Sequence, residues 1–196
     1  MPSLSQHIAK RAAELPEGSL LCPRALLHLG SRAAVDQALS RLARRGQLMR
    51  VCQGVYVRPI ETRFGLRPPA VEKVIEALAE LWGETIVPCG GSVANFLGLT
   101  TQTPVQSVYL TSGPSRRLKL GALTVHLRHA PRWQLVAPHR PAGDAVRALA
   151  WLGEIEENLG AIASKLSPAD LDEFVGLRVL MPAWLAELVS ARIVNA

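Results

Sequence analysis

One stretch of the chain combines the residue types that recognise base edges and phosphates in duplex DNA. Between Ser31 and Gly46, an amide and several guanidinium groups recur on a segment with helical spacing. Arginine bonds guanine, and glutamine bonds adenine, through paired hydrogen bonds in the major groove. Arginines near the end of such a helix would instead meet phosphates. The residues predicted to make or support DNA contacts from this segment are Arg32, Gln37, Ser40, Arg41, Arg44 and Arg45.

The apolar positions of the same segment predict which face carries those groups. Val35, Ala38, Leu39 and Leu42 recur at the i, i+3, i+4, i+7 spacing of an amphipathic helix. The polar and basic residues fall on the opposite face, which we therefore expect to be exposed. A solvated basic face on a helix that only packs is the alternative interpretation, and the order of the neighbouring elements favours DNA.

The elements around this helix follow the order of a winged helix-turn-helix. Two helices joined by a tight glycine turn and followed by a hairpin form that motif. The hairpin would be the wing, where Arg50 and Gln53 can reach the DNA backbone or the minor groove. The predicted elements, in chain order, are helices over 3–15, 24–29 and 32–45 and strands over 47–52 and 55–58.

A second basic cluster lies in the middle of the chain. Between Glu84 and Asp144 there is no acidic residue, but there are six basic ones. After the turn at Gly113 come Arg116, Arg117 and Lys119, which would face an anionic partner: nucleic acid, a nucleotide or an acidic protein. An exposed hairpin without a binding role is the alternative.

Signals for enzymatic chemistry are weak. Gly90-Gly91-Ser92 opens a predicted helix like a phosphate cradle, but it lacks the lysine and the full glycine spacing of a P-loop. His126 and His129 would point to opposite faces of a strand, so they do not predict a metal site. A metal-dependent nuclease needs clustered carboxylates, which the acid-free centre lacks. We therefore expect a protein that is not an enzyme, with no catalytic residue, cofactor or metal.

The predicted fold class is α+β, in two domains. A winged helix-turn-helix domain over 1–59 is followed by a proline-rich linker over 60–69 and a mixed α/β domain over 70–196 that ends in helices. The elements predicted for the second domain are helices over 70–82 and 92–99, strands over 85–88, 106–111, 117–120 and 123–128, and helices over 145–152, 158–166, 168–175 and 182–194.

Composition limits the class of protein further. With 48% hydrophobic and 19% charged residues, the 196-residue chain is not intrinsically disordered. It has no membrane-spanning apolar run and no signal-peptide core, and its three cysteines have no paired spacing, so we expect a cytoplasmic protein. The net charge is +6, and residues 1–68 hold 11 Lys and Arg against 4 Asp and Glu. This distribution favours a polyanionic partner for the first domain.

Two stretches carry a resemblance to a known family. Residues 35–59, VDQALSRLARRGQLMRVCQGVYVRP, resemble the end of the winged helix-turn-helix of AbiEi-type antitoxins. Residues 90–131, from GGSVANFLGL to LTVHLRHAP, resemble the centre of their C-terminal domain, and the later segments ALAWLG and PAWLAEL are also similar. These proteins are antitoxins of bacterial type IV toxin–antitoxin modules, some of which abort phage infection.

The resemblance implies an antitoxin that binds operator DNA and represses its own operon, with a recognition helix over 31–45 and a wing over 50–58. It also implies that the C-terminal domain counters a nucleotidyltransferase-like toxin, without necessarily forming a stable complex. The basic surface of that domain would centre on Arg116, Arg117 and Lys119. The protein would be a monomer in solution or a dimer on DNA, away from membranes. A stand-alone winged-helix regulator and a DNA-targeted nucleotide-binding protein are the alternatives.

Overall fold

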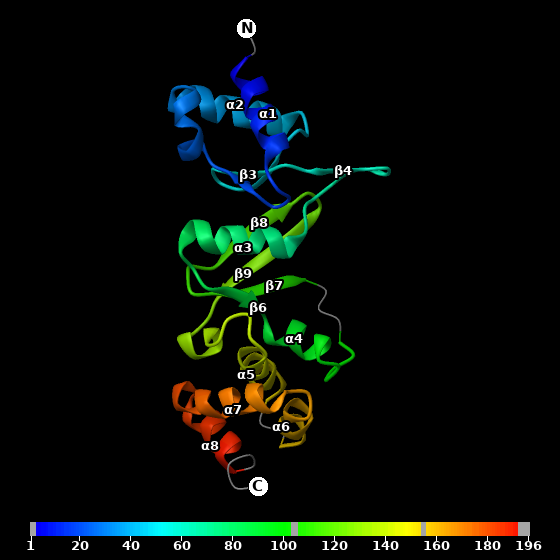
Figure 1. Cartoon of the computed structure of the whole chain (residues 1–196), viewed down its shortest axis with the longest axis vertical. Coiled ribbons are helices and arrows are strands. Elements are labelled where there is room, and N and C mark those ends of the chain that lie inside the picture. The colour runs from blue at the N-terminus through cyan, green and yellow to red at the C-terminus, as the bar shows by residue number, and fades with distance from the viewer. Residues whose placement is uncertain (1–2, 103–105, 154–155, 192–196) are drawn as a thin grey trace. The chain divides into compact units, whose positions relative to one another are not determined.

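The chain folds into two compact units of mixed α and β structure. The computed structural model describes residues 3–102, 106–153 and 156–191 (Figure 1). Unit 1 consists of residues 1–84 together with 117–125, and unit 2 consists of 85–116 together with 126–196. Residues 70–84 and 117–125 therefore fold with the N-terminal segment, although the sequence suggested a domain that begins at residue 70.

Unit 1 begins with three helices and a small sheet. Ser3 and Ser31 cap the first and the last of the helices, because their hydroxyls accept the N–H groups of Gln6 and Ala34. The strands form an antiparallel sheet in the order β1-β3-β2. The elements are α1 (Leu4–Glu14), β1 (Leu20–Leu21), the 3-10 helix η1 (Pro23–Leu29), α2 (Arg32–Arg44), β2 (Met49–Cys52) and β3 (Val55–Val57).

Helices α1 and α2 and strands β2 and β3 agree with the prediction in type and order, whereas the second predicted helix is the 3-10 helix η1. The helices enclose a common core of aliphatic side chains that includes Ile8, Leu26, Leu39 and Leu48, each no more than 2% exposed. Burial of such side chains is the main stabilising contribution to a small unit of this kind.

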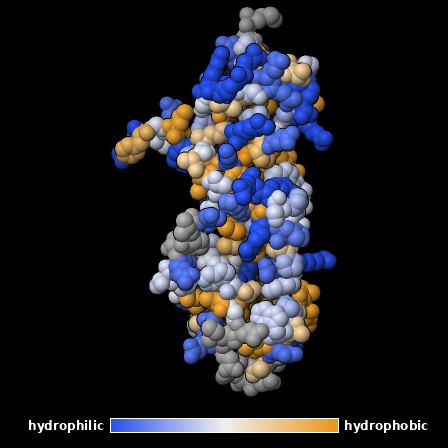
Figure 2. Space-filling model, turned by 180° about the vertical axis from the view of Figure 1, so that it is seen from behind, coloured by the Kyte–Doolittle hydropathy of each residue, from blue (hydrophilic) through white to orange (hydrophobic). Residues whose placement is uncertain are grey.

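The segment predicted as a linker contains a hairpin. Strands β4 (Ile60–Thr62) and β5 (Gly65–Arg67) pair in an antiparallel arrangement. The Thr62 hydroxyl closes the turn, since it donates to the Gly65 carbonyl and accepts the Phe64 N–H. Phe64 is 86% exposed, and the hairpin projects with a hydrophobic tip (Figure 2). The sequence did not predict this hairpin, because its two strands are short and largely exposed, and so lack the alternation that burial imposes.

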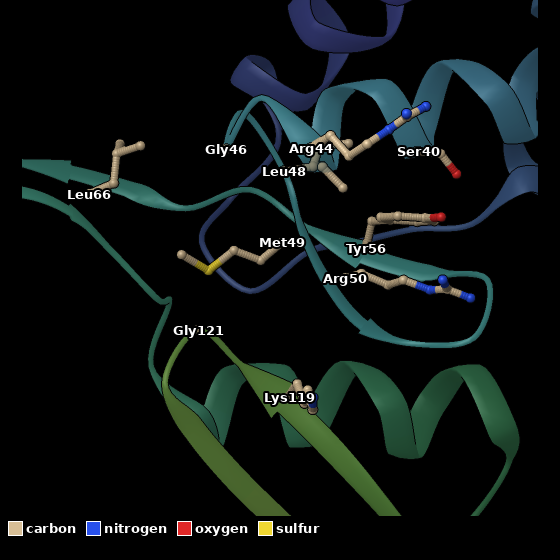
Figure 3. A pocket seen from close by; sticks show the side chains of 11 residues that line it. Ser40, Arg44, Gly46, Leu48, Met49, Arg50, Tyr56, Leu66, Lys119 and Gly121 are labelled. Carbon is tan, nitrogen blue, oxygen red and sulfur yellow. The ribbon is translucent and has the colours of Figure 1, made fainter.

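The rest of unit 1 comes from two distant parts of the sequence. Helix α3 (Val71–Trp82) lies alongside the hairpin of β8 (Arg116–Leu120) and β9 (Leu123–His129), as Figures 1 and 3 show. Val74, Ile75 and Leu78 form the buried stripe of the helix. Leu118 and Leu120 are buried on β8. Their burial shows that the hairpin contributes apolar side chains as well as charged ones.

Unit 2 is mostly helical. Its strands β6 (Ile86–Pro88) and β7 (Ser107–Thr111) pair antiparallel and belong to a four-stranded sheet of order β6-β7-β9-β8. The helices are α4 (Gly90–Phe96), η2 (Arg132–Leu135), α5 (Pro141–Leu152), α6 (Glu156–Ala163), α7 (Pro168–Gly176), η3 (Leu177–Leu180) and α8 (Ala183–Val189). The helix predicted over 182–194 is thus present to Val189, and its end lies outside the described residues. None of the helices described is long and apolar enough to cross a membrane.

A buried arginine organises the centre of unit 2. Arg147 of α5 is 1% exposed. Its guanidinium pairs with Asp144 and donates to the carbonyls of Gln134 and Val136. Burial lowers the pKa of Arg147, and the hydrogen bond with Asp144 opposes that change. The ion pair therefore keeps this guanidinium charged while it holds η2 and its following residue against α5.

Candidate nucleic-acid interface

Helix α2 separates its apolar and basic residues onto opposite faces. Val35, Ala38 and Leu39 are fully buried, and Leu42 is 2% exposed. The residues predicted for the outer face, Gln37, Arg41 and Arg44, are exposed, and Ser40 is half-buried. The amphipathic prediction for this helix is confirmed, so its outer face is free to approach a partner.

The positive charge of α2 is concentrated toward its C-terminal end. Arg32 Nε lies 2.9 Å from Asp36 Oδ2, an i,i+4 ion pair on the surface of the helix. By contrast, Arg41, Arg44 and Arg45 form no ion pair within the part of the chain that the structure describes. These cations also lie at the C-terminal end of α2, where the helix dipole favours positive charge. Arg32 is thus partly neutralised, and the last turn carries the cations that remain available to phosphates.

The hairpin of β2 and β3 presents further polar groups next to α2. Arg50 Nε donates to the Cys52 carbonyl at 3.4 Å, across an irregularity in the strand register. Gln53 is exposed at the turn. Gly54 follows it with φ of +71°, a conformation that glycine adopts without strain. The two residues predicted for the wing, Arg50 and Gln53, are therefore both accessible.

A groove of about 790 Å³ lies beside α2 within unit 1, and we call it the α2 groove (Figure 3). Arg44 reaches it from α2, Arg50 from β2 and Lys119 from β8. The remaining polar side chains are Ser40 and Tyr56, and no carboxylate belongs to the lining among the residues described. The apolar lining consists of Ala43, Leu48, Met49 and Leu66. Three cations from three elements thus face one space.

The three residues predicted as an antitoxin surface do not share one face of their strand. Arg117 and Lys119 are exposed, whereas Leu118 and Leu120 between and beyond them are buried. Arg116 is half-buried, and strand alternation sets it on the face of Leu118. Only Arg117 and Lys119 therefore form a common basic surface on β8.

The glycine pair that resembles a phosphate cradle has a packing role instead. A Cβ on Gly90 would lie 2.1 Å from the Arg147 carbonyl oxygen, and one on Gly91 would lie 3.1 Å from the Trp151 ring. The start of α4 is therefore in direct contact with α5, which leaves no room for a side chain at Gly90 and only a tight space at Gly91. This contact explains both glycines without a nucleotide.

Potential metal and nucleophile sites do not assemble in the described residues. No group of three His, Cys, Asp or Glu side chains is close enough to hold a metal ion in the described ranges. The His129 ring lies 2.9 Å from the Gly113 carbonyl, so one ring nitrogen is engaged. Burial raises the pKa of the Cys22 thiol, which disfavours the reactive thiolate form. The basic surface of unit 1 is thus the best-developed candidate site.

Sequence reasoning predicted exposed polar residues on α2 and on the β2–β3 hairpin, but it did not predict the groove. Lys119 and Arg44 are 75 positions apart, and no local pattern links them. Tyr56 also lines the groove, but in the sequence it looks like an ordinary strand residue. Only the tertiary fold brings these side chains together.

Comparison with known proteins gives a family and one solved structure. Residues 7–165 match the model of a family of unknown function, DUF6088. No curated protein sequence matches the chain. The chain is similar to the crystal structure of the RV2827C protein from Mycobacterium tuberculosis, with 14% sequence identity and a TM-score of 0.45 over 98% of this chain and 82% of that one. Because the family model spans most of its length, the chain belongs to the DUF6088 family.

Proposed function

We propose that the protein binds duplex DNA in a sequence-specific manner and represses its own operon. The observation that carries this proposal is the outer face of α2, where Gln37, Arg41 and Arg44 are exposed opposite a fully buried apolar stripe. The succession of α1, η1, α2 and the β2–β3 hairpin supports a winged helix-turn-helix, in which the last helix enters the major groove.

Each group on this surface has a chemically defined task. Gln37 and Arg41 offer the paired donors and acceptors that distinguish bases in the major groove. Arg44 and Arg45 lie at the end of the helix, where their positive charges contact phosphates at the edge of the major groove. Arg50 and Gln53 reach the flanking backbone from the wing. Arg32 contributes less, because Asp36 already occupies its guanidinium.

The test is binding of the full chain to DNA from upstream of its own gene, compared with a scrambled duplex, across a salt series. We expect preference for the upstream duplex and a linear fall of log K with log salt, with a slope of about −0.9 per phosphate contact. Equal and weak binding to both duplexes would refute the proposal.

A double variant, Arg41→Ala with Arg44→Ala, tests the site itself. It should abolish the preference for the upstream duplex while the melting temperature stays unchanged, because both side chains are exposed. The matched control is Arg132→Ala with Lys165→Ala, which removes the same charge from exposed positions of unit 2. If the α2 variant retains wild-type affinity, another surface must read the DNA.

The resemblance of residues 90–131 to AbiEi-type antitoxins favours a second proposal, namely that the protein also counters a nucleotidyltransferase-like toxin. Expression of the neighbouring gene with and without this chain tests it, with growth as the measurement. Growth arrest that the chain relieves would support an antitoxin. A neighbouring product without toxicity would leave a stand-alone regulator of transcription.

A further inference from the structure

The net charge of the protein belongs to unit 1 alone. Unit 1 holds 14 Lys and Arg against 8 Asp and Glu, whereas unit 2 holds 8 of each. The whole formal charge of +6 is therefore carried by the unit that contains α2. Two of its cations, Arg117 and Lys119, come from β8 and not from the N-terminal segment. This distribution groups them with the DNA-binding elements.

The end of the β8–β9 hairpin lies close to Pro68 and to the end of the Met49 side chain. Gly121 stands at the turn with φ of +64°. A Cβ there would lie 3.1 Å from Pro68 Cγ and 3.9 Å from Met49 Cε. Met49 begins β2, the first strand of the wing, so the turn lies close to the hairpin that would flank the DNA. Lys119, two residues before this turn, lines the same groove as Arg50 and Arg44 (Figure 3).

The chemistry of the α2 groove suits a polyanion. Arg44, Arg50 and Lys119 line it, and none of them forms an ion pair within the described ranges of the chain. Uncompensated cations on separate elements repel one another and gain most from a ligand that brings several negative charges. Duplex DNA carries one phosphate charge per about 1.7 Å of its axis, so one backbone can engage several of these groups.

We propose that β8 is a second DNA-binding element, in which Lys119 and Arg117 contact phosphates of the duplex whose bases α2 reads. This inference rests on the proposed DNA-binding function and extends its site to a strand outside the winged helix-turn-helix. Contacts of this kind anchor the protein on the backbone and carry no sequence information of their own. Under this proposal Arg117 and Lys119 contact DNA, whereas the family resemblance implies that they face a toxin.

The experiment uses the full chain with Arg117→Gln and Lys119→Gln, two exposed positions where loss of charge leaves the core intact. The control is Arg132→Gln with Lys165→Gln, exposed residues of unit 2 that do not line the groove. Binding to the upstream and scrambled duplexes is measured across a salt series. The slope of log K against log salt should become shallower by about 0.9 per lost contact, about 1.8 in total, for the β8 variant only.

The ratio of affinities for the two duplexes should be unchanged in the β8 variant, because phosphates alone are contacted. An unchanged salt slope in the β8 variant would overturn the inference. If the slope were unchanged and toxin neutralisation were lost, β8 would instead bind a protein partner. Loss of the affinity ratio would overturn the assignment to phosphates. If the wild-type chain shows no preference for the upstream duplex, the proposed function itself fails, which is a distinct result.

Discussion

Glu17 joins the N-terminal segment to the start of α3 through three hydrogen bonds. Its carboxylate accepts from Lys73 Nζ at 2.9 Å, from the Ala70 N–H at 3.1 Å and from Arg67 Nη1 at 3.2 Å. The hydrogen bonds from Lys73 and Ala70 lower the pKa of Glu17 from 4.5 to about 2. A carboxylate with a lowered pKa in the folded state stabilises the protein above its unfolded pKa. That stabilisation is lost as the pH falls from about 4.5 toward about 2.

The variant Glu17→Gln tests this role. At neutral pH it should melt below the wild type, because the ion pairs with Lys73 and Arg67 are gone. The difference in melting temperature should close as the pH falls through the range from 4.5 to about 2, where the wild-type carboxylate takes up its proton. Melting curves across pH supply the measurement, with Glu14→Gln on the exposed side of α1 as control. A difference that did not depend on pH would mean that charge is not the cause.

At the scale of elements, the packing of α4 on α5 depends on Gly90, which has no side chain. A Cβ on Gly90 would meet the Arg147 carbonyl oxygen at 2.1 Å and Trp151 Cβ at 2.7 Å. Since neither atom is at the end of a flexible side chain, Gly90→Ala must push the two helices apart. We expect a loss of about 3 kcal/mol in the free energy of unfolding, at the upper end of overpacking effects.

Gly160→Ala is the matched control for this prediction. Gly160 lies in α6 with no atom within 4 Å of the Cβ that alanine would add. The better helix propensity of alanine should then stabilise the protein by about 0.5–1 kcal/mol. Urea denaturation of the two variants gives both values. Equal effects would show that α4 and α5 do not pack as closely as described.

These elements also show which parts of the fold the sequence could predict. The α2 stripe of Val35, Leu39 and Leu42 was predictable because helical periodicity is a local property. The role of Gly90 was not, since it depends on α5, more than fifty residues further along the chain. The β4–β5 hairpin escaped prediction for a different reason, namely that its exposed strands leave no hydrophobic pattern.

For the molecule as a whole, the candidate site was predictable only in its N-terminal part. Arg41 and Arg44 follow from one helix face, and the excess of basic residues over 1–68 favours a polyanionic partner. When charge is counted along the sequence, however, Arg117 and Lys119 fall outside the basic N-terminal region. Within unit 1 the fold brings Lys119 into the lining of the same groove as Arg44, and the β8–β9 turn lies close to Pro68 and Met49.

The composition of unit 1 leads to a prediction about a fragment that ends at residue 69, where the sequence suggested a domain boundary. Such a fragment lacks α3 with its buried stripe, Lys73 that pairs with Glu17, and the turn at Gly121 that packs on Met49. We therefore expect it to melt well below the full chain and with a broader transition, as followed by circular dichroism.

The proposed DNA binding supplies a second test of the fragment. Under conditions where the fragment is folded, it retains Gln37, Arg41 and Arg44 but has lost Arg117 and Lys119. Its salt slope should therefore be shallower than that of the full chain by about 0.9 for each lost phosphate contact. A fragment that melts with the full chain and binds with the same slope would show that residues 1–69 are self-sufficient. In that case α3 and β8 would contribute neither to the stability of residues 1–69 nor to DNA recognition, which would need the N-terminal segment alone.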